Sequence, residues 1–240
     1  MKVLIGCEES QAVCIEFRKL GHEAYSCDLL PCSGGHPEWH LQMDVFEAIK
    51  LTEGEMMICF PTCTYLTCSA EWAYKDGPYH QKIKQGTFVG HARREARLDA
   101  IKFALRLFKC SIKKAAMENP IGVLSTVFRK PDQVIHPFMF GDDASKGTCL
   151  WIKGLPLLQS TGYAEIKKYR CRCGNVFSHE YGKYGCCPDY AAKPIWGNQT
   201  NSGQNNLTPS ADRAKLRSKT FPGIAKAMAE QWGKTNNNDK

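Results

Sequence analysis

The segment from Met56 to Cys63 reads MMICFPTC, an apolar run that Pro61 ends two positions before Cys63. A short, continuous run of this kind is typical of a strand that is buried on both faces. Strands of parallel sheets have this character because helices cover both faces of the sheet. We therefore expect a central strand with Cys63 just beyond its end.

Three further segments predict strands of the same sheet. They are Lys2–Gly6 (KVLIG), Glu23–Cys27 (EAYSC) and Ala115–Met117 (AAM), and a helical pattern from Glu9 to Leu20 separates the first two. Strands that alternate with helices favour a Rossmann-like α/β fold with a doubly wound, mostly parallel sheet.

Polar residues follow three of these four strands. Asp28 comes directly after Glu23–Cys27, Cys63 follows the central strand, and Glu118 follows Ala115–Met117. Ligands of doubly wound sheets bind outside the carboxyl ends of the strands. Because parallel strands end at the same edge, we expect these three side chains to gather there.

The longest helical pattern starts near His91. Its apolar residues recur at spacings of three and four, which predicts a stripe packed against the sheet. The members of this stripe are Leu98, Ile101, Leu105 and Phe108.

Composition narrows the class of protein. The 240 residues include 32 lysines and arginines against 24 acids, a formal charge of +8, which is compatible with a polyanionic partner. The sequence contains neither a membrane span of ~18 apolar residues nor a signal peptide. We therefore expect a soluble, cytoplasmic protein without a membrane partner. In that compartment thirteen cysteines indicate reduced thiols, a metal site or a catalytic thiol rather than a disulfide framework.

Two of the edge residues carry chemistry. Cys63 is either a nucleophilic thiol or a small core residue. Glu118 is either a functional acid or an acid that caps a helix or forms a salt bridge. In order and spacing, the motifs Phe60–Cys63 (FPTC) and Glu118–Pro120 (ENP) resemble those of the cytosine-5 DNA methyltransferase family, in which they read Pro-Cys and Glu-Asn-Val.

Further stretches resemble a bacteriophage and prophage branch of this family. They are CTYLT at 63–67, FGD at 140–142, KGTCLW at 146–151 and the closing segment 217–232, which begins RSKT. The likeness spans most of the chain and leaves out the cysteine cluster. It implies a methyltransferase-type version of the Rossmann-like sheet.

The resemblance also implies the catalytic residues. Cys63 would add to carbon-6 of cytosine, and Glu118 would protonate or hydrogen-bond ring nitrogen 3. Carbon-5 then becomes nucleophilic enough to accept a methyl group from S-adenosylmethionine. Asn119, which shares the motif of Glu118, belongs to the same catalytic set. Lys146 and Arg129 are candidates to replace the family's late arginine.

The donor site departs from the family pattern. Family members carry Phe-x-Gly-x-Gly after the first strand, whereas this chain reads GCEES from Gly6 to Ser10. An acid after the second strand can accept the ribose hydroxyls of a nucleotide, and Asp44 matches the group that recognises the adenine amine. Surface salt bridging would also explain either aspartate. The expected donor-binding residues are Gly6, Glu8, Asp28, Asp44, Pro61 and Gly223.

A separate cysteine cluster predicts a structural metal. Two pairs of cysteines lie twelve residues apart, which fits a tetrahedral zinc site on a small ribbon. His179 is an alternative to one thiol, and reduced thiols in a loop are the alternative to the metal. The expected ligands are Cys171, Cys173, Cys186 and Cys187.

These expectations divide the chain into parts. Residues 1–160 would form the catalytic and donor-binding core, and 161–206 a small cysteine-rich recognition region with a polar loop. Residues 207–232 would form a closing helix that returns to the core, and 233–240 a disordered tail.

The function that we expect is methylation of cytosine in DNA, with DNA and a small methyl donor as partners. Two alternatives stay open. One is a related enzyme that modifies carbon-5 of pyrimidines with another donor or a free nucleotide. The other is a non-catalytic DNA-binding protein with a zinc ribbon. The sequence leaves the oligomeric state open.

Overall fold

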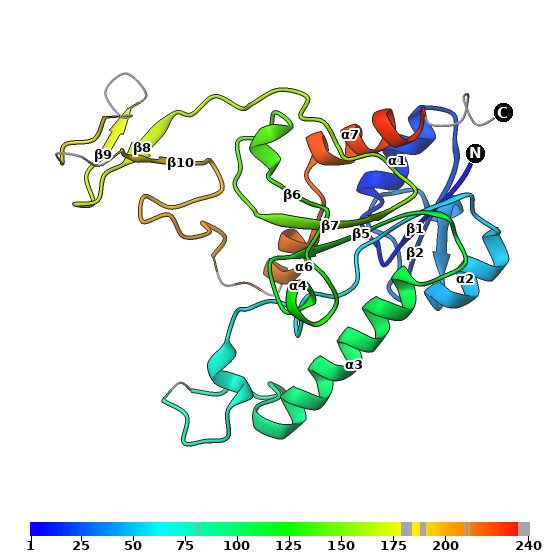
Figure 1. The fold of residues 1–240 in the computed structure, drawn as a ribbon, viewed down its shortest axis with the longest axis horizontal. Helices are drawn as coiled ribbons and strands as arrows, with labels where there is room; N and C mark the ends of the chain where they lie inside the picture. The colour runs from blue at the N-terminus through cyan, green and yellow to red at the C-terminus, as the bar shows by residue number, and fades with distance from the viewer. Residues whose placement is uncertain (81, 179–183, 188–190, 209, 211, 235–240) are drawn as a thin grey trace.

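The computed structural model describes residues 1–80, 82–178, 184–187, 191–208, 210 and 212–234. Within them, a seven-stranded sheet has the order β3-β2-β1-β4-β5-β7-β6 (Figure 1). Its strands are β1 (Lys2–Gly6), β2 (Glu23–Asp28), β3 (His40–Gln42), β4 (Met56–Cys59), β5 (Lys114–Pro120), β6 (Gln133–Ile135) and β7 (Thr148–Lys153).

Helices cover both faces of this sheet. The α-helices are α1 (Ala12–Lys19), α2 (Val45–Thr52), α3 (Gly90–Phe108), α4 (Leu124–Val127), α6 (Arg213–Ser218) and α7 (Pro222–Trp232). Short 3-10 helices are η1 (Pro37–Trp39), η2 (Glu71–Tyr74) and η3 (Pro137–Met139). The segment 207–232 thus holds two helices, α6 and α7.

The pairing confirms the expected doubly wound, mostly parallel sheet. β1 pairs in parallel with β2 and β4, and β5 pairs in parallel with β4. β7 is antiparallel to both β5 and β6. The strand order reverses next to β1, which is where ligands of such sheets bind.

The register confirms that the carboxyl ends of the central strands meet. Gly6 lies beside Cys27 on one side and Cys59 on the other, and Cys59 lies beside Met117. Glu118 comes one residue later and belongs to β5 itself, because β7 continues the pairing as far as Pro120.

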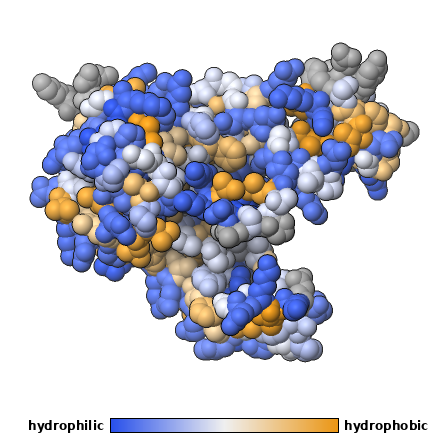
Figure 2. All heavy atoms as spheres, turned by 180° about the vertical axis from the view of Figure 1, so that it is seen from behind, coloured by the Kyte–Doolittle hydropathy of each residue, from blue (hydrophilic) through white to orange (hydrophobic). Residues whose placement is uncertain are grey.

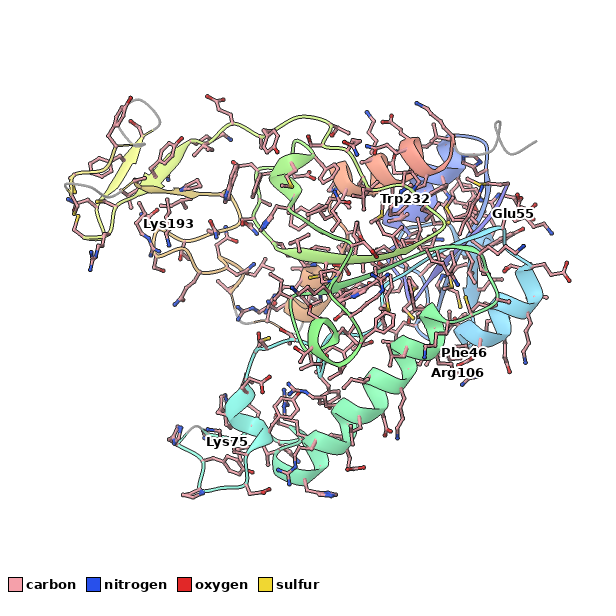
Figure 3. The ribbon with its side chains drawn as sticks, in the orientation of Figure 1. Phe46, Glu55, Lys75, Arg106, Lys193 and Trp232 are labelled. Atoms are coloured by element: carbon pink, nitrogen blue, oxygen red, sulfur yellow. The ribbon has the colours of Figure 1, made fainter. Side chains whose placement is uncertain are left out.

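Two apolar layers hold the sheet between its helices. On one face α1 and α7 pack together, and Phe17 and Trp232 are fully buried there. On the other face α2 and α3 cover the sheet, with Leu107 and Trp151 buried. Figure 3 shows Arg106 of α3 beside Phe46 of α2, where the guanidinium lies 3.7 Å from the ring centroid.

The predicted apolar stripe of α3 is wrong at its first residue, Leu98, whereas Ile101 packs against the core. Leu98 is 49% exposed, and the buried residues of α3 include Arg93 and Ala104. The physical reason is that the first half of α3 projects beyond the sheet with the loop 61–89 (Figure 1). There Arg93 packs against the rings of Tyr65 and Tyr74 at 5.4 and 4.7 Å.

A second projection contains the cysteine cluster. Its small antiparallel sheet has the order β10-β8-β9, formed by β8 (Lys168–Arg170), β9 (Val176–Ser178) and β10 (Lys193–Ile195). Where it joins the core, Trp196 stacks on Phe138 with ring centroids 4.4 Å apart. Figure 2 shows the two projections as separate lobes with a concave surface between them.

Two further expectations are a disordered tail at 233–240 and the absence of a membrane span. Most of the expected tail, from 235 to 240, lies outside the described residues. Among the helices that the structure describes, none combines the length and the apolar character needed to cross a bilayer.

Candidate active site

The loop that carries Cys63 is tied to strand β5. The side-chain amide of Asn119 donates a hydrogen bond to the carbonyl oxygen of Pro61 over 2.7 Å. Both residues are buried, and Asn119 is only 1% exposed. Asn119 follows Glu118 directly, and Pro61 lies two residues before Cys63. This bond therefore holds the strand that carries Glu118 against the loop that carries Cys63.

A second tie lies on the far side of Cys63. The backbone N–H of Val123 donates to the carbonyl oxygen of Leu66 over 2.8 Å, and Thr67 pairs with Gly122. Only glycine fits at 122, because a Cβ there would overlap the Leu66 carbonyl oxygen. We call these two ties, Asn119–Pro61 and Gly122/Val123–Leu66/Thr67, the loop clasp.

Helix α3 holds the same loop from outside. Arg97 donates to the carbonyl oxygen of Tyr65 over 3.0 Å and pairs with Glu71 at 2.6 Å. The Cys63 carbonyl oxygen accepts from the N–H of Leu66 over 2.9 Å, which closes the loop into a turn. The sequence analysis missed Arg97 and Gly122, since neither stands in a recognisable motif.

The charge of Glu118 acts on the Cys63 thiol. Cys63 is exposed at its loop, and the pKa of its thiol is raised by desolvation and by the charge of Glu118. Desolvation also raises the pKa of the Glu118 carboxyl. The structure therefore brings this predicted pair to one place, where a protonated Glu118 favours the Cys63 thiolate.

Two cations face this pair from other elements. The charge of Lys146, which precedes β7, lowers the pKa of both Cys63 and Glu118, and Arg217 of α6 lowers that of Cys63. The Lys146 ammonium donates to the Arg217 carbonyl oxygen over 3.2 Å. Arg129, the other candidate for the family's arginine, instead pairs with Asp132 at 2.7 Å.

The predicted donor loop makes a tight turn after β1. Cys7 has φ 59°, a left-handed conformation that glycine adopts most easily. The turn is thus made without the glycine that the family pattern has there. Gly6 is required for packing, because a Cβ would lie 2.9 Å from a methyl group of Val45.

Glu8 points away from the edge and into the start of α1. Its carboxylate accepts hydrogen bonds from the N–H groups of Val13 and Cys14 over 2.7 and 3.3 Å. Such N–H groups at a helix start have no partner within the helix. Burial raises the pKa of Glu8 to about 8, although the two hydrogen bonds lower it. The side chain of Glu8 is therefore used as a helix cap.

Asp28 and Asp44 lie at the same edge as Gly6. Burial, together with the charges of Asp28 and Asp44, raises the pKa of Cys7 to about 12. One oxygen of Asp28 accepts from the N–H of Leu30 over 2.9 Å. One oxygen of Asp44 caps α2 by accepting from Phe46 over 2.8 Å. Within the described residues, no hydrogen bond or ion pair engages the second oxygen of either carboxylate.

The loop after Asp28 is fastened to α1. The buried side-chain amide of Gln11 exchanges two hydrogen bonds with the backbone of His36, over 2.8 and 3.0 Å. Ser26 of β2 contacts the ring of His40 at 2.9 Å. These bonds fix the loop that would border a nucleotide at Asp28.

Gly223 lies at the start of α7 and has a packing contact of its own. A Cβ at this position would overlap the carbonyl oxygen of Phe140, and its N–H donates to Asp142 over 3.0 Å. The residues expected to hold the donor therefore fall into two groups. Asp28 and Asp44 offer the acceptors that ribose and adenine require, whereas the Glu8 side chain and Gly223 are engaged elsewhere.

The four predicted metal ligands come together in the second projection. The sulfur atoms of Cys171, Cys173, Cys186 and Cys187 all lie within 4.8 Å of one another. Four thiolates at Zn–S distances of ~2.3 Å fit this spread. The thiol of Cys173 lies 3.0 Å from that of Cys186. His179, the alternative ligand, lies outside the described residues.

The electrostatics of this cluster also suit a metal. Desolvation opposes ionisation of Cys171, but hydrogen bonds from Cys173 and Cys187 lower its pKa to about 6. The thiolate is the form that binds zinc. Four convergent thiols with one readily ionised member therefore fit a structural zinc ion.

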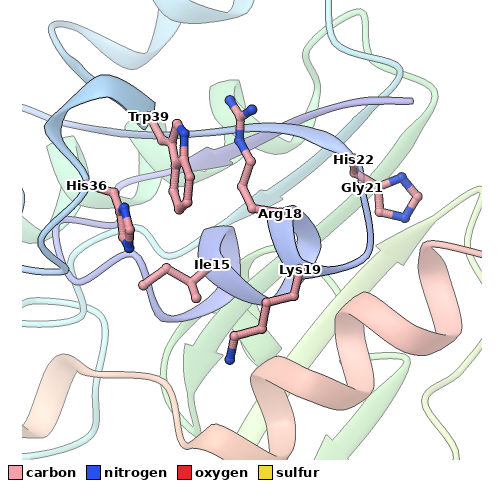
Figure 4. Close-up of a pocket in the computed structure, with 7 residues that line it drawn as sticks. All are labelled: Ile15, Arg18, Lys19, Gly21, His22, His36 and Trp39. Atoms are coloured by element: carbon pink, nitrogen blue, oxygen red, sulfur yellow. The ribbon is translucent and has the colours of Figure 1, made fainter.

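A hollow of about 490 Å³ lies elsewhere on the surface (Figure 4). It is lined by α1 and by the segment before β3, where the rings of His36 and Trp39 stack at 3.9 Å. Neither Cys63 nor Glu118 lines it. The candidate active site is thus the open edge of the sheet rather than this hollow.

Comparison with solved structures gives likenesses at low sequence identity. The S. pombe Dnmt2 methyltransferase matches with 12% identity and a TM-score of 0.39, over 63% of this chain and 50% of that chain. A triple mutant of Spodoptera frugiperda DNMT2 matches with 11% identity and a TM-score of 0.37, over 68% of this chain and 54% of that chain. The chain spans about half the length of these proteins, and such likenesses carry no argument about activity. No protein-family model matches the chain, and no curated protein matches it.

Proposed function

We propose that this protein is a DNA cytosine-5 methyltransferase that works through a covalent adduct of Cys63. The observation that carries the proposal is the loop clasp, which holds the Cys63 loop against the strand that bears Glu118. A thiol and a carboxyl group at one ligand-binding edge are what addition to a pyrimidine ring requires.

In the first step of the proposed reaction, both Cys63 and Glu118 react with the cytosine ring. The Cys63 thiolate forms a bond to carbon-6, while Glu118 delivers its proton to ring nitrogen 3, so that an enamine results. The raised pKa of Glu118 supports this role, because the carboxyl keeps its proton to higher pH. After methylation, the carbon-5 proton passes to solvent water, and the carbon–sulfur bond breaks with its electron pair going to Cys63, which leaves as a thiolate. Ring nitrogen 3 returns its proton to Glu118.

Asn119 has a positioning role in this proposal. It is buried and its amide is bonded to Pro61, so it holds the loop rather than touching the base. Lys146 and Arg217 favour the Cys63 thiolate by their charge. They take the place that the resemblance gives to a late arginine.

S-adenosylmethionine would supply an electrophilic methyl group at this edge. Asp28 would accept hydrogen bonds from the ribose and Asp44 from the adenine amine, each with its free carboxylate oxygen. Gly6 and the Cys7 turn would let the backbone approach the donor. The Glu8 side chain is left out of this set because it caps α1.

The zinc-braced projection is the proposed recognition region. The concave surface of Figure 2 separates it from the other projection. We also propose that the chain belongs to the bacteriophage and prophage branch of the family. The support for this part is the set of sequence motifs that resemble that branch. A base buried in a duplex must leave the stack to reach Cys63, so the proposal includes flipping of the target cytosine.

The direct test is mass spectrometry of nucleosides from DNA incubated with the protein and S-adenosylmethionine. We expect 5-methyldeoxycytidine with the native protein and with Cys68→Ser, since Cys68 is a second exposed thiol of the same loop. Cys63→Ser should give none. A different added mass would identify another donor chemistry and contradict methyl transfer. Unmodified cytosine with every donor would overturn the enzymatic proposal.

A further inference from the structure

Helix α6 and the residue that follows it, Lys219, form a strongly basic segment. The segment Arg213–Lys219 reads RAKLRSK, which places four cations among seven residues without an acid. Lys215, Arg217 and Lys219 are all exposed. Arg213 is partly buried and is therefore not part of the exposed face. We call Lys215, Arg217 and Lys219 the α6 basic face.

This face lies between the two halves of the candidate active site. The Arg217 carbonyl oxygen accepts a hydrogen bond from Lys146, and the charge of Arg217 acts on Cys63. On the other side, the Lys215 ammonium lies 3.9 Å from the carboxylate of Glu9, in the predicted donor loop.

The charges of the α6 basic face are poorly balanced by the protein. The contact of Lys215 with Glu9 is long, and no carboxylate partner of Arg217 or Lys219 is found among the described residues. A basic segment that serves only solubility could lie anywhere on the surface, whereas this one lies close enough to Cys63 for the charge of Arg217 to act on the thiol. Its position instead suits a polyanion that approaches Cys63.

We propose that the α6 basic face binds the backbone phosphates next to the target nucleotide. This inference rests on the proposed function, since it takes a nucleic acid as the partner. It adds that an element outside the zinc-braced projection fixes the strand at the site. Lysine and arginine side chains are the groups that contact phosphate oxygens most often, and such contacts position a nucleic acid without reading its sequence.

Phosphate contacts leave a measurable signature in the salt dependence of binding. Each neutralised phosphate releases condensed counterions and contributes about −0.9 to the slope of log K against log salt concentration for duplex DNA. Two lost contacts should therefore make the slope about 1.8 less steep. Arg217 is left unchanged in the test because its charge also acts on Cys63.

The experiment measures binding of a fluorescent DNA duplex by anisotropy from low to high salt, for three full-length proteins. They are the native chain, the double variant Lys215→Gln/Lys219→Gln, and the control Lys109→Gln/Lys113→Gln. The control removes the same charge from exposed lysines between α3 and β5, at the opposite edge of the sheet. Thermal melting of all three checks that the fold is kept.

We expect the slope to fall by about 1.8 in the α6 variant and to stay unchanged in the control. Equal slopes in the two variants would overturn the inference and leave the methyltransferase proposal intact. A slope that falls in the α6 variant, together with no modified cytosine in the mass-spectrometry test, would support this inference and overturn the methyltransferase proposal. A native protein without salt-dependent DNA binding would overturn both.

Discussion

The amide nitrogen of Asn119 lies 2.7 Å from the carbonyl oxygen of Pro61, across the ends of two neighbouring parallel strands. This hydrogen bond spans 58 residues of sequence and joins the two short motifs that carry the chemistry. Its consequence is that Cys63 and Glu118 do not vary their separation freely. The separation of Cys63 and Glu118 thus depends on a buried hydrogen bond between two other residues, Asn119 and Pro61.

The other half of the loop clasp gives the first prediction. In Gly122→Ala the new Cβ overlaps the Leu66 carbonyl oxygen, so the Cys63 loop must move. We expect kcat for methyl transfer to fall roughly a hundredfold, as 1 Å displacements of catalytic groups do, while donor binding by calorimetry stays unchanged.

The matched control is Gly54→Ala, whose Cβ meets its nearest neighbour at an ordinary 3.4 Å. It should keep native kcat. Equal activity of the two alanine variants would show that the clasp does not position Cys63.

A second prediction concerns the charge of Glu118. Because this charge raises the pKa of Cys63, Glu118→Gln should lower that pKa. The rate of Cys63 alkylation, measured by peptide mass spectrometry against pH, should reach its midpoint at lower pH in the variant. Cys68 serves as internal reference and should not shift. An unchanged Cys63 midpoint would mean that the two groups are not neighbours.

Metal removal gives a third prediction. Protein prepared without chelator should contain one zinc per chain, and Cys171→Ser should lose it. Neither of the two apolar layers includes a residue of the cysteine-containing projection, so the core should stay folded. Limited proteolysis after chelation should therefore cut between β8 and β10 and spare residues 1–160. Native protein without stoichiometric zinc would contradict the metal site.

The buried helix cap predicts a pH dependence of stability. The pKa of Glu8 is about 8 in the folded chain against 4.5 for an ordinary glutamate. A raised pKa means that the folded state holds the proton more tightly, so this stabilisation is complete below about pH 4.5 and is lost as pH rises through 8.

Urea unfolding between pH 5 and 8 measures this dependence. Relative to the native chain, Glu8→Gln should lose less stability as pH rises, with a difference in slope of up to about 1.4 kcal/mol per pH unit. Glu47→Gln, at an exposed glutamate of α2, should follow the native slope. Identical slopes for Glu8→Gln and the native chain would mean that Glu8 ionises normally.

Much of the sheet was predictable because its strands are short apolar runs with clear ends. Lys2–Gly6 ends at a glycine and Met56–Cys59 shortly before a proline, and both were placed within one residue. The stripe of α3 was not predictable in the same way. Periodicity indicates which residues share a face, but it does not show that half of the helix extends past the sheet.

The site was predictable as a set of motifs but not as a geometry. Cys63 follows β4 and Glu118 lies near the carboxyl end of β5, so topology alone brings them to one edge. The contacts of Arg97 and Gly122 depend on how two loops cross, which no local pattern encodes. The capping role of Glu8 was missed because a buried carboxylate in a turn has the same sequence signal as one that faces a ligand.

The most direct test of the central claim uses DNA that contains 5-fluorodeoxycytidine. Fluorine at carbon-5 blocks the final proton loss, so the enzyme that adds to carbon-6 stays attached to its substrate after methyl transfer. We expect an SDS-resistant complex with the native protein whose cross-linked peptide maps to Cys63, and none with Cys63→Ser. Absence of the complex, or attachment through another cysteine, would contradict the claim that Cys63 and Glu118 act on one cytosine.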